Sequence, residues 1–389
     1  MYVTRALSLY TRHREALSLA PPEGPNSGYL VIHDGLEYES STSCCGLCNN
    51  NIDISHLPFP QNKVINISDS EFSRGFVFIP VPNQPLSSNR YYAIVSHGPN
   101  KGKAIKCSKK IDMGTSCFGR PYVQDVNSVA LDPLNTYQQI EIINQKNHCG
   151  FTAKSITDGF PPEMLRFKNW TAQMETPKYY QLHHQAQGLN SSLRTILPSL
   201  NFPLSSDSSA PVVVGKWYCP FMFVEEVMKL KDRVETSMFY EMTLEQRWVR
   251  VFECDNIGNH KKLVLVNVVV ETEDVRVMGR KANWDDTHVY NNVVWFWSDE
   301  NIEENDHRVG LNMAIVERMK WEQKRVGWIS GDERKGIVER AEEFHGKAHD
   351  WTKFGCYVLV ERFVLKRMGG SLLLTYDFKH THQIRCKWE

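Results

Sequence analysis

The chain has 389 residues, of which 41% are hydrophobic and 23% charged, and its 45 Lys and Arg balance its 45 Asp and Glu. A chain of this length is expected to form two domains rather than one core. Its balanced charge gives no overall field that would attract nucleic acid. No stretch reaches the roughly 20 apolar residues of a membrane-spanning helix. We therefore expect a soluble protein that neither binds nucleic acid nor is integral to a membrane.

The N-terminal segment and the cysteines indicate the compartment. Residues 1–25 lack the apolar core of a secretory signal, although Arg5, Arg12 and Arg14 precede any acid, as in some transit peptides. Without a secretory signal, the ten scattered cysteines are expected to be reduced thiols in the cytoplasm rather than a disulfide framework.

Residues 1–186 are predicted to form a strand-rich N-terminal domain. Short apolar bursts rich in aromatic and β-branched residues stand between turn-forming residues, which is typical of strands. Residues 91–108 are predicted to form a hairpin with its tip at His97 to Gly102. The bursts are GYLVI at 28–32, GFVFIPV at 75–81, RYYAIVS at 90–96 and YQQIEII at 137–143.

Residues 187–211 are rich in Ser, contain three prolines and carry almost no charge. This composition predicts a linker between the N-terminal domain and a C-terminal domain over residues 212–389.

The C-terminal domain is predicted to contain longer elements. Residues 356–386 form two alternating runs joined at Gly369-Gly370, which predicts a hairpin with a positive φ in its turn. Residues 261–271 are apolar on both faces and predict a central strand, and residues 291–298 predict another strand. In residues 332–351, apolar residues recur at spacings of four and three from Ile337, which favours a helix. Residues 312–325 also favour a helix, and a long strand is the competing interpretation for this segment.

These elements predict an α+β fold with mainly antiparallel sheets and few helices, since strands and helices do not alternate regularly.

Three clustered cysteines, Cys44, Cys45 and Cys48, are the most chemically distinctive stretch. A zinc site would need a fourth ligand from a distant residue such as Cys107, because the sequence has no second C-x-x-C pair. A redox motif would require a helix to follow, and three asparagines follow instead. Palmitoylation lacks a basic or amphipathic flank. Unmodified thiols in a loop are the favoured interpretation, and no cofactor is expected.

A group of lysines follows the tip of the predicted N-terminal hairpin. The segment HGPNKGKA resembles a phosphate-binding loop, but only three residues separate Gly98 from Gly102 and Ala104 replaces the hydroxyl residue. The lysines predict a surface for an anionic lipid or an acidic protein partner, with a solvated edge strand as the simpler interpretation. They are Lys101, Lys103, Lys106, Lys109 and Lys110.

Other polar stretches predict no complete site. Residues 298–308 are acidic but lack the ligand spacing of a calcium loop, and Asp285, Asp286 and His288 suit a turn. If residues 380–386 form a regular strand, His380, His382 and Cys386 share a face, where two histidines alone do not complete a metal site. The common catalytic motifs are absent from the sequence.

Several stretches together resemble a plant-specific family known only as a domain of unknown function, DUF1262. They include PPEGPNSGYLVI, LPFPQNK, GKWYCPFMFVEE and the terminal YDFKHTHQIRCKWE. The resemblance implies a plant protein, and some members carry the label of insecticidal crystal toxin domain proteins. The family supplies no catalytic residues. We expect a non-enzymatic interaction or stress- and defence-associated protein. A lipid-binding or pore-forming protein and an enzyme without a recognisable motif stay open as alternatives.

Overall fold

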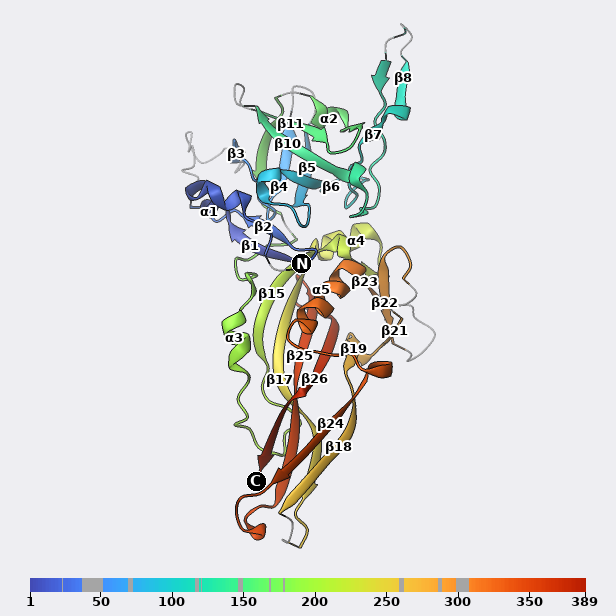
Figure 1. Cartoon of the computed structure of the whole chain (residues 1–389). Helices are drawn as coiled ribbons and strands as arrows, with labels where there is room; N and C mark the ends of the chain where they lie inside the picture. Colours follow the sequence, from blue (N-terminus) through green and yellow to red (C-terminus); the bar gives the residue numbers. More distant parts are fainter. Residues whose placement is uncertain are drawn as a thin grey trace. The chain divides into compact units, whose positions relative to one another are not determined.

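The structure is a computed structural model of the whole chain (Figure 1). It describes residues 1–22, 24–36, 52–68, 73–115, 119, 121–145, 150–167, 169–177, 179–258, 262–285, 289–298 and 308–389. These residues divide into two compact units. Unit 1 comprises residues 1–187, 218–224 and 228–240, and unit 2 comprises residues 188–217, 225–227 and 241–389.

Unit 1 is built around an antiparallel sheet in which seven strands have the order β11-β10-β6-β5-β4-β13-β3. Further strands of this unit are a parallel pair β1–β2, in which Tyr2 also pairs antiparallel with Tyr218, and two small pairs, β12–β7 and β8–β9. Its elements are β1 (Tyr2–Ala6), α1 (Leu7–Arg12), β2 (Gly28–Ile32), β3 (Ile52–Ile54), β4 (Val64–Ser68), β5 (Ser73–Pro80), β6 (Arg90–Val95), β7 (Ser108–Lys109), β8 (Met113–Thr115), β9 (Pro121–Val123), β10 (Gln139–Gln145), β11 (Gly150–Ser155), β12 (Gly159–Phe160), α2 (Glu163–Arg166), β13 (Thr171–Glu175) and α4 (Leu230–Thr236).

The four predicted N-terminal strands are present as β2, β5, β6 and β10. Aromatic side chains form much of the core of unit 1, and the Phe59 ring lies 5.0 Å from that of Phe78 and 5.1 Å from that of Phe151. The predicted hairpin is also present, because Ile94 bridges Ala104 and the backbone of Val95 pairs with that of Lys103. The sequence pattern therefore identified three neighbouring strands of the main sheet of unit 1, β5, β6 and β10, and one strand outside that sheet, β2.

Unit 2 contains most of a second, larger sheet of nine strands. Its strands beyond β2 and β1 have the order β15-β17-β25-β26-β19-β20, with β14 beside β15. Its elements, three of which also contribute residues to unit 1, are β14 (Gly188–Leu189), α3 (Ser191–Ile196), β15 (Val212–Pro220), β16 (Val224–Glu226), β17 (Phe239–Asp255), β18 (Leu263–Glu271), β19 (Glu273–Val277), β20 (Arg280–Lys281), β21 (Asn283–Trp284), β22 (Val293–Trp297), β23 (Arg308–Asn312), α5 (Met313–Lys324), β24 (Lys335–Glu343), β25 (Lys353–Arg367) and β26 (Leu372–Trp388).

The predicted C-terminal hairpin is formed by β25 and β26, which pair antiparallel. Gly370 in its turn has a φ of +87°, a conformation that glycine adopts without steric penalty. The pairing is irregular at two points, one of which lies near the turn, between Leu365 and Lys366. At the other, Val358 is opposite Ile384, but Leu359 is opposite His380. This bulge places three extra residues in β26. Because three is odd, the side chains beyond the bulge change face.

That bulge corrects the expectation that His380 and Cys386 share a face. His380 pairs with Leu359, whereas Cys386 pairs with Cys356 in the register on the other side of the bulge. Leu359 and Cys356, both on β25, belong to different apolar clusters. The side chains of His380 and Cys386 therefore point to opposite faces of the hairpin.

Strands β18 and β24 form a separate two-stranded antiparallel sheet. The expected helix in residues 332–351 is wrong, since Lys335–Glu343 is a strand with Val338 buried between exposed neighbours. The expected central position of residues 261–271 is also wrong, because β18 has one buried and one exposed face. The helix predicted for residues 312–325 is confirmed as α5, and the strand at 291–298 as β22.

Residues 187–211, expected to be a linker, lie almost entirely in unit 2. Leu197, Leu200 and Phe202 pack with buried Leu204 against Trp248 and Tyr357. The two-domain division stays a prediction. The α+β class with mainly antiparallel sheets is confirmed by the described strands and helices.

Candidate functional site

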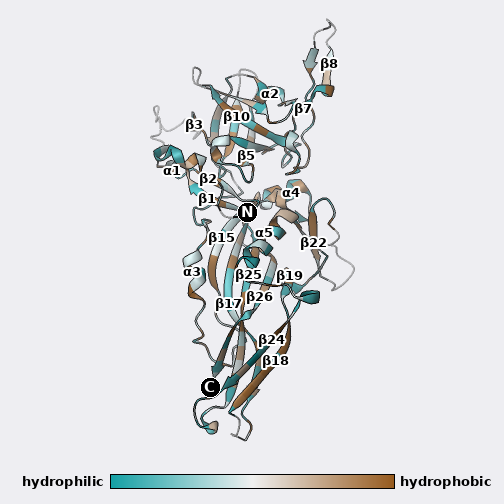
Figure 2. Ribbon diagram, viewed as in Figure 1, coloured by the Kyte–Doolittle hydropathy of each residue, from teal (hydrophilic) through white to brown (hydrophobic). Residues whose placement is uncertain are grey.

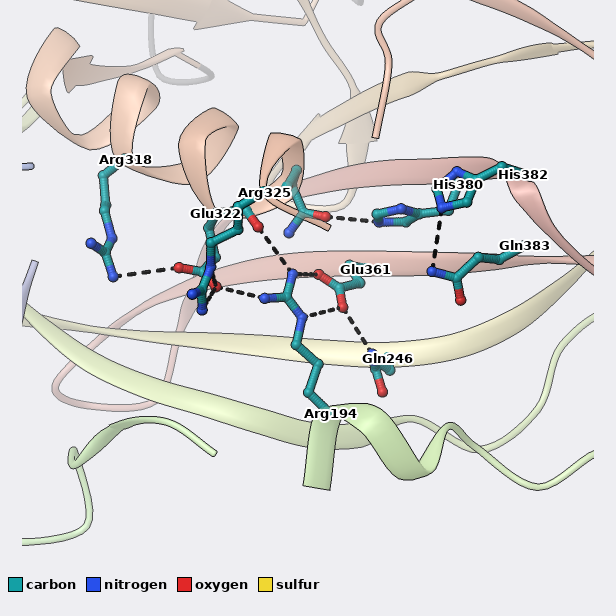
Figure 3. Close-up of polar contacts among 10 residues, drawn as sticks. Arg194, Gln246, Arg318, Glu322, Arg325, Glu361, His380, His382 and Gln383 are labelled. Atoms are coloured by element: carbon teal, nitrogen blue, oxygen red, sulfur yellow. Dashed lines mark hydrogen bonds and ion pairs between the residues drawn. The ribbon is translucent and has the colours of Figure 1, made fainter. Parts of the chain in front are cut away.

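A buried charged cluster in unit 2 is centred on Arg194 (Figure 3). Arg194 lies on α3, whose N-terminal Asn190 side chain accepts a hydrogen bond from the backbone N–H of Leu193 at 2.9 Å. This capping fixes the start of a helix that is too short to be stable alone. The Arg194 side chain is only 6% exposed.

Two carboxylates from different elements bind the Arg194 guanidinium. Its Nε donates to Glu361 Oε1 at 2.7 Å, and its Nη1 donates to Glu322 Oε1 at 2.6 Å. Glu361 is on β25 and Glu322 is on α5. Arg194 therefore joins α3, a strand of the large sheet and the long helix through charge-assisted hydrogen bonds.

Further donors bind the same two carboxylates. Gln246 Nε2 donates to Glu361 Oε1 at 2.8 Å, and Arg325 Nε donates to Glu322 Oε1 at 2.8 Å. Arg318 Nη2 lies 3.4 Å from Glu322 Oε2. Both carboxylates are thus surrounded by donors.

The charges in the cluster hold one another in the ionised state. Burial alone would raise the pKa of Glu361, but the hydrogen bond and charge of Arg194 outweigh it and the pKa is lowered. Burial would lower the pKa of Arg194, but Glu361 and Glu322 outweigh it and the pKa is raised. A fully paired carboxylate of this kind is a poor general base, because its lone pairs are already used. The cluster is best explained as a structural link.

His380 borders the same cluster. Its Nε2 lies 2.9 Å from Gln323 Oε1, so Nε2–H donates to that oxygen. Burial lowers the pKa of His380 to about 4, with His382 and Arg194 adding to the effect and Glu361 opposing it. His380 is therefore neutral at physiological pH. Among the described residues, no group of three or more His, Cys, Asp or Glu side chains is arranged to hold a metal ion.

The first predicted lysines, Lys101 and Lys103, have local partners in unit 1. Lys101 Nζ lies 3.0 Å from Glu235 Oε1, and its side chain is only 13% exposed. Lys103 Nζ donates to Asn100 Oδ1 at 3.2 Å. These two side chains are held against the protein.

The remaining lysines of this group are more accessible. Lys106 is half-buried, while Lys109 and Lys110 are exposed. Lys109 Nζ lies 4.8 Å from the centre of the Tyr137 ring, and Lys110 Nζ lies 2.8 Å from Asp158 Oδ2. The five lysines therefore do not form one set of free charges, and their binding of an anionic partner stays a prediction.

The predicted cysteine cluster of Cys44, Cys45 and Cys48 lies outside the described residues, as do most of the acidic stretch at 298–308 and both Asp286 and His288. Cys107, one of the distant ligands considered for zinc, is buried in the apolar core of unit 1.

The structure also shows an exposed apolar surface on β18 and β24, which the sequence did not predict. The outer face of β18–β24 consists of five cross-strand pairs, and all ten residues are exposed. Figure 2 shows β18 in the colour of hydrophobic residues. The pairs are Leu263–Glu343, Leu265–Ala341, Asn267–Glu339, Val269–Ile337 and Glu271–Lys335.

The opposite face of this pair of strands is buried. Val264, Val266 and Val338 pack with Trp351 and Phe354 in one apolar cluster. β18 is thus apolar on both faces although only one is covered.

Comparison with known families gives a match to a family of unknown function. Residues 23–118 match the model of the family described as Protein of unknown function (DUF1262). The resemblance to DUF1262 is therefore confirmed for this segment, which lies in unit 1. The plant origin and the association with stress or defence that it implies stay predictions.

Comparison with solved structures finds similarity to the one described as Crystal structure of Cry35Ab1. The TM-score is 0.45 and the sequence identity 11%, and the match covers 85% of this chain and 90% of that chain. No curated protein matches the sequence. In the part of the chain that the structure describes, no helix is long and apolar enough to cross a membrane.

Proposed function

We propose that this chain is a non-enzymatic binding protein and that the outer face of β18–β24 is its contact surface for a protein partner. One observation supports this most strongly: Leu265, Val269 and Ile337 are 67%, 65% and 58% exposed on one face of the same sheet, with the Asn267–Glu339 pair between Leu265 and the Val269–Ile337 pair. Single exposed apolar residues are common on protein surfaces, but several on one face, bordered by polar residues, are typical of an interaction site.

The charges on the same face favour a partner that combines apolar and basic side chains. Glu271, Glu339 and Glu343 point to this face together with Lys335. Lys281 Nζ lies 2.9 Å from Glu271 Oε2 and pairs with that carboxylate, so Glu339 and Glu343 supply most of the negative charge. Complementary charges favour association and fix the register of the partner. A strand or helix with alternating apolar and basic residues has this chemistry.

The same charges argue against the lipid-binding and pore-forming alternatives. The carboxylates of Glu339 and Glu343 repel an anionic membrane surface, since such surfaces attract basic rather than acidic segments. Neither face of β18 carries the Ser- and Thr-rich row of an aqueous pore lining, because both rows are mainly aliphatic. The enzyme alternative gains no support from the buried cluster, whose carboxylates are already paired.

The proposal is tested with a short fluorescein-labelled peptide of alternating Leu and Lys. Fluorescence anisotropy measures its binding to the whole protein and to the double variant Leu265→Ser, Val269→Thr. We expect the variant to weaken binding at least about tenfold, which corresponds to 1.4 kcal/mol. A peptide of alternating Leu and Glu should bind more weakly to the unchanged protein, because the carboxylates of the outer face repel it.

The matched control is Ile329→Ser, which removes an apolar side chain that is 75% exposed elsewhere in unit 2. It should bind the Leu–Lys peptide as the unchanged protein does. Equal loss in the control and the double variant would refute a specific surface. Dye release from phosphatidylcholine or phosphatidylserine vesicles would favour the membrane alternative instead.

A further inference from the structure

Cys356 on β25 and Cys386 on β26 lie directly opposite each other. The type of pair follows from the backbone hydrogen bonds nearby. Lys353 N donates to Glu389 O at 2.8 Å and Glu389 N donates to Lys353 O at 2.9 Å, so these two residues form a hydrogen-bonded pair.

Hydrogen-bonded and non-hydrogen-bonded pairs alternate along an antiparallel ladder, and the register is regular from Phe354 to Val358. Counting three positions from Lys353 makes Cys356–Cys386 a non-hydrogen-bonded pair. In such a pair the Cα atoms are about 4.5 Å apart and the side chains are close. This separation is at the short end of the range of about 4.4–6.8 Å that a disulfide bridges.

The two thiols already interact. A hydrogen bond between the side chains lowers the pKa of Cys356 against the opposing effect of burial, and it raises the pKa of Cys386. The pair therefore loses its first proton more readily than an isolated buried thiol. The Arg340 charge on β24 adds to this effect, while that of Glu342 opposes it.

The two cysteines differ in exposure. Cys356 is buried in the apolar cluster beneath β18 and β24, whereas Cys386 is only half-buried. An external reagent therefore reaches Cys386 Sγ first, and Cys356 Sγ is placed to react second.

We propose that Cys356 and Cys386 form a site of reversible oxidative modification, at which a small disulfide such as glutathione disulfide converts the two thiols into a cross-strand disulfide. In the first step Cys386 Sγ passes its proton to the Cys356 thiolate and attacks one sulfur of glutathione disulfide, and one glutathione thiolate leaves. In the second step Cys356 Sγ, as thiolate, attacks Cys386 Sγ, and the second glutathione thiolate leaves. The two protein thiols lose two protons and two electrons, and two glutathione molecules gain them.

The experiment follows the bond itself in the unchanged protein. The protein is equilibrated in buffers of increasing glutathione disulfide to glutathione ratio, its free thiols are blocked with N-ethylmaleimide, and it is digested with trypsin. Cleavage after Lys353, Arg362, Arg385 and Lys387 places the two cysteines in peptides 354–362 and 386–387. We expect mass spectrometry to detect these peptides joined by a disulfide in oxidising buffer and separate after treatment with dithiothreitol.

The control variant is Cys254→Ala, which removes another thiol of the same apolar cluster. It should form the same linked peptides, whereas Cys386→Ala should leave peptide 354–362 unlinked. Alkylated peptides 354–362 and 386–387 at every buffer ratio, in protein whose circular dichroism is native, would overturn the proposal. Linkage of peptide 354–362 to Cys254 instead would overturn it as well.

Discussion

Arg194 and Glu361 are 167 positions apart in the sequence, yet the guanidinium Nε of Arg194 lies 2.7 Å from Glu361 Oε1 in the interior of unit 2. This contact attaches a Ser-rich, weakly charged segment to a central strand of the large sheet. Because the ion pair is shielded from water, removing one of its partners should destabilise the fold far more than removing one partner of an exposed pair.

Replacing Arg194 with Met should destabilise unit 2 by about 3–5 kcal/mol, because Glu361 and Glu322 would be left buried without their shared cation. Urea unfolding followed by circular dichroism measures the change. Arg276→Met is the matched control, since the Arg276 side chain is 48% exposed. It should change the free energy of unfolding by no more than about 0.5 kcal/mol.

A second substitution separates charge from packing at the same place. Adding Glu361→Gln to the Arg194→Met variant removes one of the unpaired charges, so the double variant should be more stable than Arg194→Met alone. An Arg194→Met protein as stable as the unchanged one would show that the buried cluster does not hold the segment.

His380 should make unit 2 less stable in mild acid. Its pKa is about 4 in the folded protein and 6.5 in the reference state, so the unfolded chain binds the proton first as pH falls. Stability is therefore lost between about pH 6.5 and pH 4, and the shift corresponds to about 3 kcal/mol. Glu361 acts in a lower window, because its folded pKa is below 4.5 and its contribution is lost only as pH falls through that lower value.

The variant His380→Gln keeps a donor for Gln323 Oε1 but cannot titrate. Its free energy of unfolding, measured in urea at several pH values, should fall less steeply between pH 6.5 and pH 4.5 than that of the unchanged protein. Identical slopes in the two proteins would contradict a neutral, buried His380.

Local patterns predicted much of the fold. Alternation and turn-forming residues identified β2, β5, β6 and β10, and the glycines at 369–370 marked the turn between β25 and β26. The helix expected from Ile337 failed because apolar residues spaced for a helix also occur in a strand, and pairing along nine positions with β18 decided the outcome.

The buried cluster and the outer face could not be predicted, because both depend on contacts between distant residues. Nothing in the composition around Arg194 distinguishes it from an arginine in an exposed loop. β18 is apolar on both faces, and this pattern indicated a central strand of a large sheet. In the structure β18 pairs with β24 in a two-stranded sheet, and one face of β18 is exposed. The bulge that separates His380 from Cys386 likewise has no sequence signal in the form of glycine or proline.

The lysines of the N-terminal hairpin should differ in their effect on stability. Lys101→Glu places a second carboxylate beside Glu235, whose side chain is 43% exposed, and we expect this variant to unfold at a lower temperature than the unchanged protein. Lys109→Glu changes an exposed residue and should have little effect. Thermal unfolding of the two variants measures the difference. If both are neutral, the Lys101–Glu235 contact does not contribute to stability, and Lys109 and Lys110 are the better residues for tests of anionic binding.

Truncating a side chain should lower the free energy of unfolding on the inner face of β18 but not on its outer face. Val266→Ala removes methyl groups packed in the inner cluster and should cost about 2 kcal/mol of unfolding free energy. Val269→Ala truncates a side chain that is 65% exposed and should be nearly neutral. Chemical denaturation of both variants compares them directly. A large loss at Val269 would mean that this side chain is already covered within the chain.

The location of a bound peptide tests the proposed contact surface most directly. The Leu–Lys peptide, synthesised with a photoreactive diazirine group in place of one leucine side chain, is irradiated with the whole protein, and the attachment points are mapped by mass spectrometry. We predict that they concentrate in residues 263–271 and 335–343, and that Leu265→Ser with Val269→Thr removes them. Attachment concentrated elsewhere, for example near Lys109 and Lys110, or unchanged by that double variant, would contradict the proposal that the outer face of β18–β24 binds the partner.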